Sequence, residues 1–177
     1  KFGSVVLAAN AVLLNFQTFM AYALDGFAHA AEALVGKAVG RQNKLMVKQA
    51  TITAMFWSFI IAMLFALLYM LFGRMIIDQL TSLNEVRMAA YTYLPYLIAM
   101  PLVSFVCYVL DGIFIGAMLA RQMRNTMLFS LLLVFIPAWY VTKSMENHGL
   151  WIAMLAFMLA RGLSMSMVFR RKQLIVK

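Results

Sequence analysis

One acidic residue, Asp111, lies inside a long run of apolar residues. Between Tyr91 and Leu119 it is the only Asp, Glu, Lys or Arg. A carboxylate in the middle of a lipid bilayer costs a few to about 10 kcal/mol, so it is retained where it faces other protein or a water-filled cavity. Asp111 is therefore predicted to bind a proton, an ion or a cationic solute inside the membrane.

The local pattern around Asp111 occurs twice in the chain. The pattern Tyr-x-Leu-Asp-Gly runs from Tyr108 to Gly112 and again from Tyr22 to Gly26. The second copy places Asp25 in a setting like that of Asp111. Two acids in matching surroundings predict a pathway for protons, ions or a cationic solute, with the tyrosines as further contacts.

The helix that carries Asp25 has a polar stripe. At about 100° per residue, six residues fall within a narrow arc, and a polar stripe on a membrane helix is predicted to face other helices or water rather than lipid. Chains of Asp, Glu and His act as proton relays in membrane proteins. The stripe consists of Thr18, Tyr22, Asp25, His29, Glu32 and Gly36.

Several of these residues also have a purely structural interpretation. His29 is either a relay group or a partner of Asp25 four residues earlier. Glu32 is either part of the relay or a solvated acid paired with Lys37. Arg161 either extends to the membrane surface or pairs with an internal acid. One His and two acids on one helix are weak grounds for a metal site, so no metal is predicted.

The composition is that of an integral membrane protein. The chain has 177 residues, of which 65% are hydrophobic and 12% charged, whereas soluble domains average about 25% charged residues. Gly-rich phosphate loops and zinc-type Cys clusters are absent from the sequence, so no cofactor is expected. The expected fold is an all-α membrane bundle of about five spanning helices, at approximately residues 5–35, 50–72, 88–119, 127–141 and 150–169.

The basic residues predict the orientation of these helices. Ten of them fall in the first and third connections and the C-terminal tail, namely Lys37, Arg41, Lys44, Lys48, Arg121, Arg124, Arg170, Arg171, Lys172 and Lys177. The opposite side carries Lys1, Arg74, Arg87 and Lys143. The positive-inside rule places the first set in the cytoplasm and the N-terminus outside. The net charge of +9 could also indicate nucleic-acid binding. Because most of the basic residues form short clusters between apolar runs, we interpret the charge as a signal of membrane topology instead.

The same counting gives depths. Asp25 precedes Lys37 by 12 residues and Asp111 precedes Arg121 by 10. At about 1.5 Å per residue the two acids lie roughly 18 and 15 Å from the cytoplasmic edge, near the middle of a hydrocarbon core about 30 Å thick.

Three stretches resemble a known transporter family. Residues Asp25–Gly40, which end in Gly36-x-x-x-Gly40, are similar to the eighth helix and following loop of multidrug and toxic compound extrusion (MATE) transporters. Residues Leu110–Met127 and Leu159–Ser164 resemble the DNA-damage-inducible protein F branch of that family. The resemblance covers nearly the whole chain, with order and spacing preserved.

The resemblance implies a twelve-helix transporter of two six-helix lobes in the cytoplasmic membrane of a bacterium. Residues 1–177 would then form helices 8–12 of the C-terminal lobe. Because the chain begins at Lys1 without a methionine, we expect a fragment whose N-terminal lobe and seventh helix are missing. Family members export organic cations in exchange for inward H⁺ or Na⁺. Asp111 matches the position of a coupling carboxylate on the tenth helix, and the branch also uses an acid in the absent first helix.

Two other functions remain as alternatives. A flippase for lipids or lipid-linked oligosaccharides in the same superfamily would use a similar lobe, but it would need inward-facing arginines to meet phosphate, and Arg161 is the one candidate. An intramembrane enzyme would need a nucleophile or a metal set, and the sequence offers only the stripe with Asp25, His29 and Glu32. Efflux is therefore favoured over both, and no enzymatic activity is expected.

Overall fold

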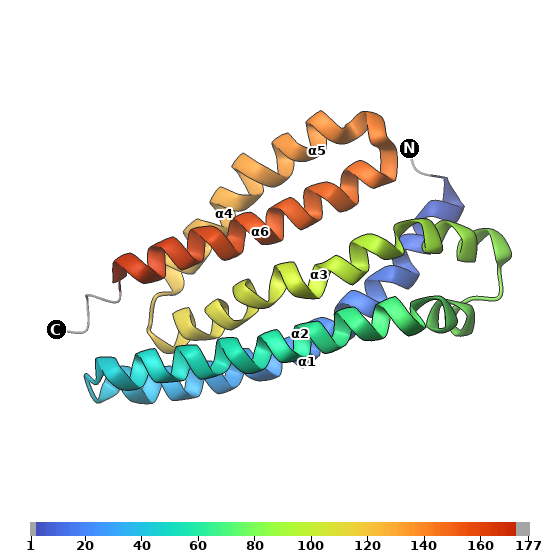
Figure 1. Ribbon diagram of the computed structural model, residues 1–177. Coiled ribbons are helices and arrows are strands. Elements are labelled where there is room, and N and C mark those ends of the chain that lie inside the picture. Colours follow the sequence, from blue (N-terminus) through green and yellow to red (C-terminus); the bar gives the residue numbers. More distant parts are fainter. Residues whose placement is uncertain (1–2, 173–177) are drawn as a thin grey trace.

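A computed structural model describes residues 3–172, and all of its regular elements are helices (Figure 1). Three long helices come first and a helical hairpin follows. Lys1 and Lys177, two of the counted basic residues, lie outside the described residues. The elements are α1 (Ser4–Gly40), α2 (Lys44–Leu80), α3 (Asn84–Gly116), α4 (Ala120–Ser130), a π-helical segment (Leu131–Phe135), α5 (Ile136–Thr142), a 3₁₀ turn (Lys143–Met145) and α6 (Glu146–Lys172).

The predicted all-α membrane bundle is confirmed. Four helical stretches of the described chain are long and apolar enough to cross a membrane, and the last of them, from Ala120 to Arg171, is the hairpin of α4–α5 and α6. Its two arms lie side by side, so the chain makes five helical passes (Figure 1). The helices are longer than predicted, because they continue through charged ends that sequence counting assigned to loops. At about 1.5 Å per residue, α1 reaches well beyond a hydrocarbon core about 30 Å thick.

The fourth predicted segment, 127–141, begins earlier and is not a regular helix. It starts at Ala120 and passes through the π-helical segment directly before Pro137. There the amide of Ile136 bonds to the carbonyl of Leu131, five residues earlier. Proline has no amide hydrogen and its ring clashes with the carbonyl four residues before it in an α-helix. The wider turn accommodates Pro137 without ending the helix.

Helices α1 and α3 end in the same kind of turn. A residue with positive φ follows each helix, Gln42 at 52° and Met118 at 59°. The next amide bonds back to a carbonyl five residues earlier, Asn43 to Ala38 at 3.0 Å and Leu119 to Phe114 at 2.7 Å. This is the hydrogen-bond pattern that commonly closes a helix C-terminus.

The centre of the fold is the contact between α1 and α3, where the two backbones touch. A Cβ atom added to Gly112 would overlap the carbonyl oxygen of Ala28 and lie 2.9 Å from its Cα. A Cβ atom added to Gly116 would overlap the carbonyl oxygen of Glu32. Glycines four residues apart allow membrane helices to approach this closely. The spacing of this Gly-x-x-x-Gly pair is visible in the sequence, but the pair was not predicted to lie at a helix contact.

The two ends of the bundle differ in which connections they carry. The α1–α2 and α3–α4 connections and the last turns of α6 gather at one end, and the α2–α3 and α5–α6 connections lie with the first turn of α1 at the other (Figure 1). The described basic residues are therefore segregated by end as the sequence predicted. Between the ends, α2 presents large exposed apolar side chains, among them Phe56, Trp57, Leu67 and Leu71, which suit contact with lipid.

Candidate functional site: a buried acid–arginine pair

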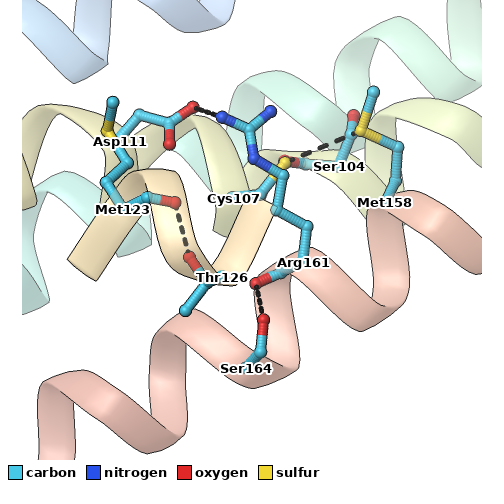
Figure 2. A network of polar contacts seen from close by, with 8 residues as sticks. All are labelled: Ser104, Cys107, Asp111, Met123, Thr126, Met158, Arg161 and Ser164. Carbon is cyan, nitrogen blue, oxygen red and sulfur yellow. Dashed lines mark hydrogen bonds and ion pairs between the residues drawn. The ribbon is translucent and has the colours of Figure 1, made fainter. Parts of the chain in front are cut away.

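Asp111 pairs with Arg161 of α6 inside the bundle. Nη2 of Arg161 donates to Oδ2 of Asp111 at 2.6 Å, and the side chains are 15% exposed for Arg161 and 21% for Asp111 (Figure 2). The distance is that of a strong charge-assisted hydrogen bond. Of the two interpretations of Arg161, the structure therefore shows pairing with an internal acid. The sequence spacing gives both residues a similar depth in the membrane, because Arg161 precedes Arg170 by nine residues and Asp111 precedes Arg121 by ten.

The pair is incompletely satisfied by the described residues. Oδ1 of Asp111 and Nε of Arg161 are both buried without a hydrogen-bond partner among them. Buried charges normally have all their polar atoms occupied, because an unpaired one carries its full desolvation cost. This arrangement can therefore accept a further donor or cation at Asp111.

Sulfur atoms and small polar groups lie next to the pair (Figure 2). Sγ of Cys107 donates to the carbonyl of Ser104 at 3.0 Å and lies 3.8 Å from the sulfur of Met158. Cys107 is fully buried. The environment of the pair is thus polarizable and largely apolar, and it joins α3 to α6.

The other predicted acid, Asp25, is half-buried on α1. It lies one turn before Ala28, whose backbone touches Gly112, the residue that follows Asp111. It makes no side-chain hydrogen bond with the described residues. Tyr108 is half-buried and Tyr22 is 72% exposed. The structure therefore brings Asp25, Tyr108 and Asp111 to one region, whereas Tyr22 points away from the packed interior.

The remaining residues of the stripe are arranged differently from the expected relay. His29 is 80% exposed, and its Nδ1 lies 3.6 Å from Glu32. Within residues 3–172, neither the predicted His29–Asp25 pair nor the Glu32–Lys37 pair is present. The stripe side chains Thr18, Tyr22 and His29 are exposed, so the described helices do not cover this face.

The two glycines expected at the end of α1 have different surroundings. A Cβ atom on Gly36 would lie 3.5 Å from the carbonyl oxygen of Gly116, while one on Gly40 would meet nothing within 4 Å. Phe114, near the end of α3, is fully buried and packs against Phe169. Among the described residues, no group of three or more His, Cys, Asp or Glu side chains gathers as a metal site.

Comparison with known proteins places this site in a family. The family model described as MatE matches residues 1–141. The chain is 42% identical over 176 residues to DNA damage-inducible protein F of Escherichia coli (strain K12). That alignment covers 97% of this chain and 37% of the relative, so the chain spans little more than a third of the relative's length.

Solved structures show the same fold. The chain is similar to the eukaryotic MATE transporter AtDTX14, with a TM-score of 0.84 at 18% identity over 98% of this chain and 41% of that one. It is also similar to a multidrug resistance MATE family transporter of the MOP superfamily in its inward-facing conformation, with a TM-score of 0.81, 16% identity, and coverage of 98% and 42%. With the family model matching most of the sequence, the chain belongs to the MATE family, whose members are transporters and not enzymes.

Proposed function

We propose that this chain forms helices 8–12 of the C-terminal lobe of a multidrug efflux transporter in the inner membrane of a bacterium. Inward movement of H⁺ or Na⁺ drives the export of organic cations, and Asp111 is the group for which cargo and coupling ion compete. The observation that carries the proposal is the buried, incompletely satisfied carboxylate of Asp111 within a MATE fold.

Competition for one carboxylate is sufficient for antiport. A cationic solute binds the ionised acid, and a proton that neutralises the acid removes the charge that holds the solute. When two lobes rock around a central cavity, the acid meets cargo on one side and the coupling ion on the other. The exposed stripe of α1, with Thr18, Tyr22 and His29, is the face that we place toward the missing N-terminal lobe and the central cavity.

The flippase alternative needs inward-facing cations that are free to meet phosphate. Arg161 was its candidate, and Arg161 is neutralised by Asp111 at 2.6 Å. A phosphate would have to displace the internal carboxylate and would be repelled by the nearby Asp25, whereas a cation that displaces the guanidinium would be attracted to both acids. The pair therefore favours an organic cation as the cargo.

The test is the variant Asp111→Asn in the two-lobe protein, meaning the transporter that contains this chain together with its proposed first lobe and seventh helix. Asparagine preserves size but carries no charge. We expect binding of a fluorescent lipophilic cation to weaken at least about tenfold, since a buried charge pair contributes several kcal/mol. The parent should bind more weakly as pH falls, because protons compete, and the variant should lose this dependence.

The control is Glu85→Gln, which removes the same charge from an exposed acid at the opposite end of α3. It should bind like the parent. Asp25→Asn should weaken binding in the same direction as Asp111→Asn. Repeating the titration in sodium and in choline salts separates H⁺ from Na⁺ as the coupling ion. Parent-like binding by Asp111→Asn at every pH would refute the proposal.

A further inference from the structure

Arg161 places a permanent positive charge on the carboxylate that is proposed to bind cations. The guanidinium reaches Asp111 from a different helix, α6, and contacts one of its two oxygens at 2.6 Å. Arginine remains charged at all physiological pH values. Arg161 therefore occupies one of the two carboxylate oxygens that a cationic cargo would contact.

The pair is not what holds α6 against α3. The backbone at Gly162 approaches Val106, since a Cβ atom there would lie 3.5 Å from the Val106 side chain. Met158 and Met165 of α6 are buried in the two apolar clusters on either side of the pair. These contacts do not involve the guanidinium, so they remain when it moves.

Among the described residues, Arg161 is the one cationic group beside Asp111. The titratable groups that interact with the pair from the other elements are Asp25 of α1, which is also acidic, and Cys107 and Tyr108 of α3. The α4 side chains drawn beside the pair, Met123 and Thr126, are uncharged (Figure 2). The contact of Arg161 with Asp111 is thus half-satisfied, and no third described residue completes it.

We propose that Arg161 is a tethered cation that competes with cargo for Asp111. When the site holds no cargo, the guanidinium pairs with the carboxylate. An organic cation binds by displacing it, and Arg161 pairs again when the cargo leaves. Arg161 is in this sense a positioning residue that sets cargo affinity through Asp111, and the inference rests on the proposed role of Asp111.

Competition of this kind has a definite sign. The apparent affinity of a ligand equals its intrinsic affinity multiplied by the fraction of molecules in which its site is free. If the pair is formed in about nine molecules of ten, removing the competitor raises the apparent affinity about tenfold. A residue that merely supports the fold would lower the affinity or leave it unchanged when removed.

The experiment measures binding of tetraphenylphosphonium, a lipophilic monovalent cation, to the purified two-lobe protein. Arg161→Met removes the charge and keeps an apolar chain of similar length, and Arg161→Gln keeps a hydrogen-bond donor without the charge. Both should bind about tenfold more tightly than the parent, and Arg161→Lys should restore parent-like binding. The matched control is Arg124→Met, which removes an exposed arginine that contacts Asn125 at 3.4 Å and should leave binding unchanged.

The outcomes separate this inference from the proposed function. If Asp111→Asn loses binding but neither Arg161 variant gains it, the tethered-cation inference is wrong and the role of Asp111 stands. If Asp111→Asn binds like the parent, the proposed function itself fails. Thermal unfolding of each purified variant identifies damage to the fold. If Arg161→Met does not fold, the same decision rests on Arg161→Gln, and weaker or unchanged binding by that variant overturns the inference.

Discussion

Replacing Gly112 with alanine should destabilise the bundle, whereas the same change at Gly26 should not. At Gly112 the new methyl group would overlap the carbonyl oxygen of Ala28, a backbone atom that no rotamer change can move. Overpacking a tight contact costs about 1–3 kcal/mol, and more where backbone must shift. At Gly26 the methyl group would meet nothing within 4 Å. Alanine is favoured over glycine in a helix by about 1 kcal/mol, so Gly26→Ala should be neutral or stabilising.

The two glycines occupy the same place in the Tyr-x-Leu-Asp-Gly pattern, which makes them matched controls. The measurement is thermal unfolding of purified two-lobe protein in detergent. A midpoint lowered by Gly112→Ala and unchanged or raised by Gly26→Ala is the expected result. Equal effects of the two substitutions would show that α1 and α3 are not in backbone contact at Gly112.

Cysteine labelling should give all-or-none results for the proposed orientation. Lys44 and Glu85 are exposed and lie at opposite ends of the bundle. In intact cells a membrane-impermeant maleimide should label Glu85→Cys and leave Lys44→Cys unlabelled. Lys44→Cys should react once the cytoplasmic side is opened, because the basic end is placed in the cytoplasm.

The native cysteine provides the control for this measurement. Cys107 is fully buried, so the parent should remain unlabelled on either side. Labelling of Lys44→Cys in intact cells would reverse the orientation. The relative direction of α1 and α3 would be unaffected, because it is a property of the fold itself.

Much of the fold could be predicted from local sequence signals. Apolar runs and the charges between them identified five passes and the two ends, because lipid permits few alternatives to a helix. Helix ends were less accurate, since charged residues such as Lys37 and Arg74 extend a helix as readily as they enter a loop. The wider turn before Pro137 was not predicted, because the sequence does not show how a helix adjusts its hydrogen bonds around a proline.

The site was predicted in part. Asp111 was identified by the cost of its charge, and Arg161 as a basic residue within an apolar helix that either extends to the membrane surface or pairs with an internal acid. The predicted partner of His29 was wrong, because Asp25 and Glu32 are both within about one turn of it and the sequence does not show which of them the ring approaches. Gly112 and Gly116 were overlooked in favour of Gly36 and Gly40. Both pairs have the same spacing. They differ in how closely another helix packs against them, which the local sequence does not show.

The backbone contact between α1 and α3 limits how this lobe can change shape. Gly112 lies against the backbone of Ala28, and Gly116 lies against the backbone of Glu32. At these two points no side chain lies between the helices, so none can change its rotamer to let the helices slide past each other. In the proposed alternating access we therefore expect the two helices to move as one rigid body. Asp25 and Asp111, one on each helix, should then keep their separation. The change in their electrostatic surroundings has to come from what approaches this body, the α6 arginine on one side and whatever faces the exposed stripe on the other.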